Sequence, residues 1–262
     1  MSIDAMHVAK TGLNAQQTRM QVIANNLANV NTTGFKRDRA NFENLLYQNI
    51  RPAGSPTSEG TQLTTPLAVG TGVRVVNTEK LYQQGSLQNT ENALDVAIDG
   101  QGFLQVLLPD GRIAYTRDGT LSRNPEGTLT TASGYVIQPE IQIPDGALSI
   151  NISADGIVSV QLPDAVEAQE VGQITLASFS NPRGLEPIGE NFLVESSASG
   201  PAVVGNPYAD GMGKLVQGAL EASNVNVVQE LVDMIETQRA YEVNSKTISA
   251  SDEMMRFLSN KL

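Results

Sequence analysis

The side chains that most often carry out chemistry in proteins are scarce in this sequence. The 262 residues include one histidine, His7, and no cysteine. A serine–histidine or cysteine–histidine nucleophile therefore has no plausible site, and a cluster of histidine or cysteine metal ligands is excluded. Carboxylates remain, and two of them suffice for glycoside hydrolysis, so a β-rich carbohydrate-active enzyme stays open as an alternative. Otherwise we expect no enzyme activity, no metal and no cofactor.

Many of the aspartates belong to one recurring dipeptide. Asp-Gly occurs at 99–100, 110–111, 118–119, 145–146, 155–156 and 210–211. Both residues tolerate positive φ, and the pairs separate strand-like runs such as "FLQVLL", "YVIQ" and "IVSVQL". We therefore expect turns rather than catalytic carboxylates or calcium ligands. The "DGQG" at 99–102 begins like a nucleotide-binding fingerprint, but it precedes a strand-like run instead of a helix.

The elements on either side of this region are predicted to be helices. Near the N-terminus, residues at spacings of three and four are Met6, Ala9, Leu13, Gln16, Met20, Ile23, Leu27 and Val30. Near the C-terminus they are Val227, Leu231, Met234, Gln238, Tyr241, Ser245, Ile248, Asp252, Met255, Ser259 and Leu262. These are heptad a and d positions, which predict one helix over about residues 5–30 and another that begins after a cap at Asn226. Gly34 is the expected terminator of the first.

The heptad spacing at the two ends of the chain has two interpretations. The two helices can pair within one chain and close a monomeric core, or they can bundle with the ends of many chains. The C-terminal seam is polar at Gln238 and Ser245, and an isolated pair of thin helices buries little surface. These features favour a helical assembly.

The whole chain is predicted to be an α+β protein. Residues 1–34 form the N-terminal helix and residues 223–262 the C-terminal helix of one discontinuous coiled-coil domain. Residues 75–222 form a mostly antiparallel β domain. Residues 35–74 form an extended connecting segment, whose part 47–73 holds three prolines, four glycines and few apolar residues and must be held by neighbours if it is ordered.

Charge is distributed unevenly along the chain. The net charge is −11, which makes nucleic acid and anionic membranes poor partners. Residues 52–222 carry 7 basic and 19 acidic side chains, whereas both ends are near balance. The sequence begins without a basic and apolar signal-peptide pattern, and no apolar run approaches the roughly 20 residues that span a bilayer. We expect no membrane insertion and an outward-facing acidic β domain.

Three segments resemble the bacterial flagellar axial proteins, a family of rod, hook and hook-associated subunits. "ANNLANVNTTGFKR", Ala24–Arg37, is similar to their N-terminal signature, and Ser223–Met255 is similar to their C-terminal signature. Asp95–Ile137 resembles the β motif shared by rod and hook proteins. The length and the residues after "FKRDRANFENLLYQNIRPAG" resemble the distal rod branch, which carries an insertion at the place of residues 47–66. A proximal rod or hook subunit is the nearest alternative.

The resemblance implies a structural subunit of the basal-body rod. The terminal helices would form the inner tube around the export channel, and the β domain the outer wall of a rigid polymer that passes motor torque to the hook. Implied partners are copies of the chain itself, proximal rod proteins, the hook protein, the surrounding basal-body ring proteins and the flagellar type III export apparatus. The implied location is the periplasm-spanning rod, reached without a cleavable signal peptide.

Two sets of residues are expected to carry this assembly. The inner-tube set is Met6, Leu13, Met20, Ile23, Asn25, Asn26, Leu27, Asn29, Val30, Asn31, Val227, Leu231, Met234, Gln238, Tyr241, Ile248 and Met255. The stiffening set, which would contact an adjacent chain, is Tyr47, Ile50, Arg51, Pro52, Pro56, Glu59, Leu63 and Pro66. The asparagines are expected either to bond to unpaired backbone groups of neighbouring subunits or to form local caps and turns.

Overall fold

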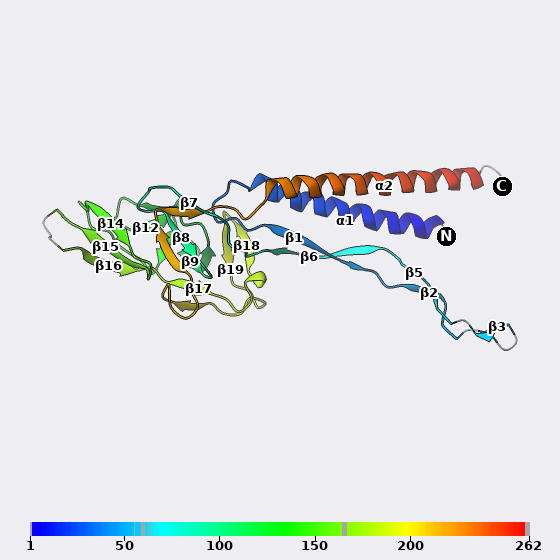
Figure 1. The fold of residues 1–262 in the computed structure, drawn as a ribbon, viewed down its shortest axis with the longest axis horizontal. Coiled ribbons are helices and arrows are strands. Elements are labelled where there is room, and N and C mark those ends of the chain that lie inside the picture. The colour runs from blue at the N-terminus through cyan, green and yellow to red at the C-terminus, as the bar shows by residue number, and fades with distance from the viewer. Residues whose placement is uncertain (1, 55, 59–60, 63, 164–166, 260–262) are drawn as a thin grey trace. The chain divides into compact units, whose positions relative to one another are not determined.

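The computed structural model divides the chain into two compact units (Figure 1). The helical unit comprises Met1–Leu27, Asp38–Glu79 and Asn226–Leu262, and the β unit comprises Ala28–Arg37 and Lys80–Val225. The structure describes all residues except 1, 55, 59–60, 63, 164–166 and 260–262. Helices at both chain ends and a mostly antiparallel middle confirm the predicted α+β class.

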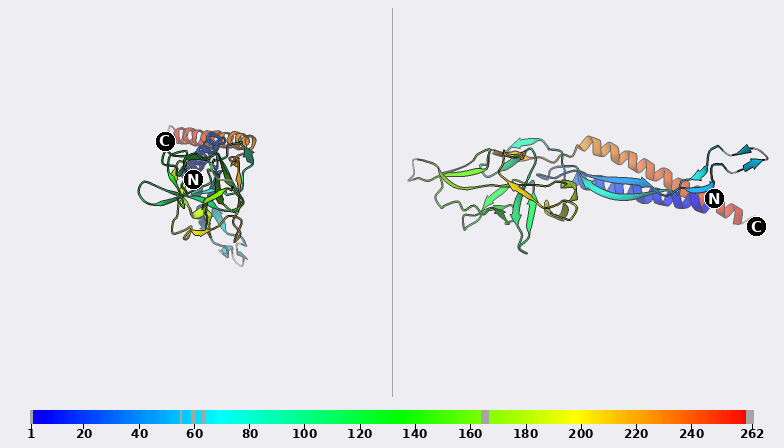
Figure 2. Two further views of the ribbon diagram at one scale, coloured as in Figure 1. Left: turned by 90° about the vertical axis from the view of Figure 1, so that its left-hand side faces the viewer. Right: turned by 90° about the horizontal axis from the view of Figure 1, so that it is seen from below.

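Two long antiparallel helices dominate the helical unit (Figure 2). They are α1 (Ser2–Ala28) and α2 (Val227–Ser259). The Asn226 side chain accepts hydrogen bonds from the backbone N–H groups of Val228 and Gln229 at 3.0 and 3.2 Å, so the predicted cap is confirmed. Within the described residues, no helix is long and apolar enough to cross a membrane.

Gly34 is not the terminator of α1, because the helix ends six residues earlier, at Ala28. Its backbone nevertheless needs glycine. Its φ is +68°, and an added Cβ would lie 2.7 Å from backbone atoms of Arg117 and Asp118. Gly34 thus permits close packing of two β-unit segments rather than capping a helix.

The rest of the helical unit is one long two-stranded hairpin, here called the hairpin arm (residues 38–79). Its ladders, from base to tip, pair β1 (Asp38–Asn44) with β6 (Val73–Lys80), β2 (Gln48–Arg51) with β5 (Leu67–Val69), and β3 (Pro56–Ser58) with β4 (Thr61–Gln62). Cross-strand side chains hold its base, where Arg39 pairs with Glu79 and Arg74 with Glu43. The segment expected to be extended is therefore extended as paired strands.

A nine-stranded antiparallel sheet forms the centre of the β unit. Its main path runs β11 (Leu121–Arg123), β12 (Leu129–Thr131), β13 (Val136–Gln138), β9 (Phe103–Leu107), β10 (Ile113–Thr116), β19 (Phe192–Val194) and β18 (Glu186–Gly189). The remaining two strands are β17 (Leu176–Ser178), which pairs with β9, and β20 (Val203–Gly205). The short 3₁₀ helix η1 spans Pro182–Gly184.

Smaller ladders complete the β unit. One has the order β14 (Ser149–Ile152), β15 (Ile157–Gln161), β16 (Gln169–Gln173). The other two pair β21 (Lys214–Gln217) with β8 (Val96–Asp99), and β22 (Ala219–Glu221) with β7 (Leu87–Asn89). Asp-Gly turns at 110–111 and 155–156 connect β9 to β10 and β14 to β15, as their residue types predicted.

The core of the β unit is aliphatic, as the composition indicated. Leu104, Leu129, Ile174 and Leu176 are fully buried at its centre. A second cluster is aromatic, and Phe179 meets the Tyr115 ring edge-on at 4.8 Å between centroids. The β unit therefore has a complete core within one chain.

Candidate assembly site

The most deeply buried side chains of α2 are polar. In the described part of α2, the fully buried residues are Glu230, Thr237 and Ser251, and none of them is apolar. Gly12 of α1 faces Asn244 of α2, where an added Cβ would lie 2.9 Å from the Asn244 side-chain nitrogen. This pairing within one chain is the first of the two interpretations of the heptads, yet it leaves many large apolar side chains of α2 exposed.

Large apolar side chains of α2 are exposed instead. Along its first half these are Val227, Val228, Leu231, Val232, Ile235, Tyr241 and Val243. Val228 is 71% and Val243 62% exposed. At about 3.6 residues per turn, Val228 lies about half a turn, and Val243 about a third of a turn or slightly more, around the helix from the buried Glu230 and Thr237. A helix with apolar residues on several faces is usually buried by partners on several faces. We call these seven residues the outer face of α2.

The predicted inner-tube residues fall into three groups. Ile23 is buried, while Met6, Leu13, Met20, Leu27, Val30, Met234, Ile248 and Met255 are half-buried. Val227, Leu231, Gln238 and Tyr241 are exposed in the single chain. Heptad spacing alone missed Val228, Val232 and Ile235, which lie outside the predicted seam. Counting apolar residues at every position of α2 would have found them.

Three asparagines of the first signature, Asn25, Asn26 and Asn29, make contacts within their own chain. Asn26 is buried, its amide donates to the Asp38 carbonyl oxygen at 2.9 Å, and its Oδ1 accepts from the Asp38 N–H at 2.8 Å. Asn25 donates to the Asp38 carboxylate at 3.3 Å. Asn29 accepts from the Thr32 hydroxyl in a turn, while Asn31 is exposed. Asn26 thus satisfies the backbone of the hairpin arm in its own chain.

The predicted stiffening residues lie in the outer half of the hairpin arm. Tyr47 and Ile50 are more than half exposed, and Arg51, Pro52 and Pro66 are exposed too. Pro56 begins β3. Glu59 and Leu63 lie outside the described residues. Two-stranded hairpins of this kind are marginally stable without a packed face.

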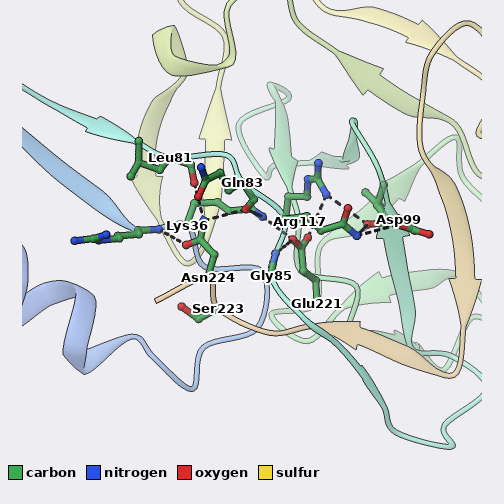
Figure 3. A network of polar contacts seen from close by, with 12 residues as sticks. Lys36, Leu81, Gln83, Gly85, Asp99, Arg117, Glu221, Ser223 and Asn224 are labelled. Atoms are coloured by element: carbon green, nitrogen blue, oxygen red, sulfur yellow. Dashed lines mark hydrogen bonds and ion pairs between the residues drawn. The ribbon is translucent and has the colours of Figure 1, made fainter. Parts of the chain in front are cut away.

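A cluster of polar contacts in the β unit was not foreseen from the sequence (Figure 3). Its first centre is Glu221, whose side chain is fully buried. One carboxylate oxygen accepts from Lys36 Nζ at 2.6 Å and from the Gly85 N–H at 2.8 Å, and the other accepts from Arg117 at 3.1 Å. The Glu221 backbone carbonyl also accepts from the Gly34 N–H at 2.8 Å.

The second centre is Asn224, three residues further along the chain. Its amide donates to the carbonyl oxygens of Leu81 and Gln83 at 2.8 and 2.9 Å, and its Oδ1 accepts from the Arg37 N–H at 2.7 Å. Lys36 also donates to the Gln83 carbonyl at 2.9 Å. We call the contacts of Glu221 and Asn224 together the junction network.

Electrostatics explain why this cluster must stay intact. Burial lowers the pKa of Lys36 and of Arg117, and the Glu221 carboxylate opposes both shifts. Arg117 has further support from the Gly100 carbonyl at 2.6 Å and from the face of the Phe103 ring. A buried cation without its carboxylate is costly, so each member depends on the others. A sequence signal did exist: Glu221 shares the inward face of β22 with buried Ala219, an unusual place for a lone charge.

Two of the aspartates in Asp-Gly pairs, Asp110 and Asp118, accept hydrogen bonds from residues two positions later in the chain. Asp110 accepts from the Arg112 N–H at 3.0 Å and from the Arg112 side chain at 2.6 Å, and these bonds lower its pKa. Asp118 accepts from the backbone and hydroxyl groups of Thr120. These are turn-stabilising contacts, as expected from the dipeptide.

Three protein-family models match the chain. "Flagella basal body rod protein" matches residues 6–36, "Flagellar hook protein FlgE/F/G D1 domain" matches residues 97–160, and "Flagellar basal body rod FlgEFG protein C-terminal" matches residues 216–261. The three regions correspond to α1 with its following segment, the central β unit, and α2 with the strands before it.

Curated proteins resemble the chain over nearly its full length. It is 53% identical to the flagellar basal-body rod protein FlgG of Buchnera aphidicola, over 98% of this chain and 99% of that protein. It is 46% identical to the protein of the same name from Caulobacter vibrioides, over 98% of each chain. The identity to the FlgG of Bacillus subtilis is 38%, over 95% of this chain and 96% of that protein.

Proposed function

The chain belongs to the FlgG family of flagellar basal-body rod proteins, and we propose that it polymerises through α1 and α2 into a rigid tube. In this proposal the tube encloses the export channel and transmits motor torque to the hook. The role is mechanical, with the β unit as the outer wall. A structural family of this kind also favours a non-enzymatic subunit over the carbohydrate-active alternative.

The observation that carries the proposal is the outer face of α2. A chain of ordinary composition buries most of its large aliphatic side chains, but here seven residues of one helix remain exposed. The covered face of α2 holds the buried Glu230, Thr237 and Ser251 and three half-buried apolar residues, Met234, Ile248 and Met255. Pairing within one chain therefore does not cover the outer face. Neighbouring copies that cover the outer face would bury them and would stabilise both helices.

The hairpin arm supports a second contact between copies. Its exposed Tyr47 and Ile50 are suited to anchor on an adjacent chain, and Arg51 could fix the register. The prolines at 52, 56 and 66 lower the entropy lost when the segment becomes ordered. We propose that residues 47–66 become fully ordered only in the polymer and stiffen it there, because a small added contact is repeated on every subunit.

The proposed partners follow from the same architecture. Copies of the chain form the tube, proximal rod and hook proteins meet its two ends, and basal-body ring proteins surround it in the periplasm. We propose export by the flagellar type III apparatus without a cleavable signal. The acidic β unit would face the rings through small, salt-sensitive contacts, since a rotating shaft must slip inside its bushing.

A pair of substitutions tests polymerisation directly. Val228→Asp and Leu231→Asp place charge on the outer face of α2 and should abolish polymers of the purified full chain, seen by sedimentation and electron microscopy. Val204→Asp is the control, because it adds the same charge at an exposed apolar residue of the β unit. Circular dichroism should show an intact β unit in every variant. Polymers of parental length from the charged variants would refute the proposal.

A further inference from the structure

The chain passes between the two units at four points, after residues 27, 37, 79 and 225. Three segments of the β unit carry all of these crossings: residues 28–37, residues 80–86 and residues 219–225. We call them the crossing segments. They come from distant parts of the sequence, so nothing in local structure makes them meet. Any force that passes from one unit to the other through the covalent chain must enter through them.

The junction network ties these three segments to each other twice. Glu221, on the third segment, holds Lys36 on the first and the Gly85 N–H on the second. Asn224, also on the third, holds the Arg37 N–H on the first and the Leu81 and Gln83 carbonyl groups on the second. Each of the two side chains therefore joins all three crossing segments (Figure 3).

Backbone bonds reinforce the same arrangement. The Leu81 N–H donates to the Arg37 carbonyl at 2.8 Å, and the Ala222 N–H donates to the Ser86 carbonyl at 2.8 Å. Gly85 permits this closeness, because a Cβ there would overlap the Ala222 carbonyl oxygen. Arg117 comes from the end of β10 and fastens the cluster to the central sheet through Glu221.

We propose that Glu221 and Asn224 are positioning residues that lock the three crossing segments together, so that mechanical load is shared by all connections between the units. The inference rests on the proposed function in one respect, namely that the mechanical load is the torque of the motor. A single flexible connection would stretch and twist under load. Three crossing segments joined by buried, charge-assisted hydrogen bonds move as one body.

Isosteric variants test this role without creating cavities. Glu221→Gln removes the charge that holds Lys36 and Arg117, and Asn224→Asp removes the amide donors to Leu81 and Gln83. Asp95→Asn is the matched control, because Asp95 is a buried carboxylate of the same unit whose side chain bonds to Asn92 outside the crossing segments. Hydrogen exchange of the full-length monomer, resolved by segment, is the first measurement.

We expect each junction variant to raise exchange by about tenfold or more in all three crossing segments at once, while strands β9 and β10 keep parental protection. The control should leave the crossing segments unchanged. A merely structural role would instead raise exchange across the whole sheet. The proposal is overturned if exchange rises only in residues 219–225, if no segment changes, or if both variants lose protection throughout the β unit.

Polymer stiffness is the second measurement. Junction variants should still form tubes, but electron micrographs should show a shorter persistence length than for the parent and for Asp95→Asn. Tubes of parental stiffness from variants with loosened crossing segments would overturn the load-sharing role. Failure of the parent chain to form tubes would instead count against the proposed function, because the exchange experiment on monomers does not depend on polymerisation.

Discussion

The β unit and the helical unit place their apolar residues in opposite ways. The β unit buries a continuous aliphatic core, with Leu104 and Ile174 fully inaccessible. In the described part of α2 the fully buried residues are polar, while Val228, Ile235 and Val243 are exposed. The β unit therefore has a complete apolar core within a single chain, whereas the helical unit leaves large apolar side chains of α2 exposed, as the proposed polymerisation requires.

The largest expected difference between the units is in hydrogen exchange of the free subunit. Amides of β9 and β10 should exchange at least roughly three orders of magnitude more slowly than amides of α1 and α2, because only the β unit opens by global unfolding. Exchange measured by mass spectrometry on a verified monomer checks this. Equally slow exchange in both regions would break the comparison.

The same substitution in both units should have unequal effects on stability. Leu104→Ala removes a fully buried side chain and should lower the free energy of unfolding of the β unit by about 2–5 kcal/mol. Leu231→Ala, on the outer face of α2, should change subunit stability by no more than about 0.5 kcal/mol. It should instead raise the concentration needed for polymerisation. Urea titration and sedimentation measure the two quantities, and equal stability losses would contradict the prediction.

Deletion of residues 47–66 should separate the role of the terminal helices in assembly from the role of the hairpin arm in stiffness. The terminal helices remain, so tubes should still assemble, but they should bend because contacts from the hairpin arm are lost. Curvature in electron micrographs measures the effect. A useful control replaces the segment with Gly and Ser of equal length, which keeps the span of the chain. Deleted tubes as straight as the parent's would show that the segment does not stiffen them.

The smallest expected effect concerns the Asp110 turn of the β unit. Its folded pKa is lowered mainly by hydrogen bonds from Arg112, so its contribution to stability is present above its ordinary pKa of 3.8. That contribution is lost as the pH falls through the lowered folded value. Asp110→Asn should therefore lower stability slightly at neutral pH, leave it unchanged near pH 2, and so flatten the acid limb of the stability curve. Thermal unfolding between pH 2 and 7 measures it, and an identical acid limb would count against it.

Local sequence patterns were sufficient to predict most of the helices and hairpins. The spacing of apolar residues predicted both helices, Asn226 predicted the start of α2, and Asp-Gly at 110–111 and 155–156 predicted two hairpins. Each of these signals acts within a few residues, through periodicity or through tolerated backbone angles. The boundaries of α1 and the role of Gly34 were predicted less well. The first and last residues of a helix depend on its tertiary neighbours as well as on the local sequence.

The sequence by itself determined that the ends of this chain are helical, that its middle is β, and that the side chains for nucleophilic or histidine–cysteine metal chemistry are scarce. Only the tertiary structure decided which face of α2 is covered and which side chains meet at the junction network. Glu221 meets Lys36 from 185 residues away, and Asn224 meets Arg37 from 187 residues away. No local pattern encodes such a pairing, because its energy comes from charges and backbone groups that become neighbours only when the whole β unit folds.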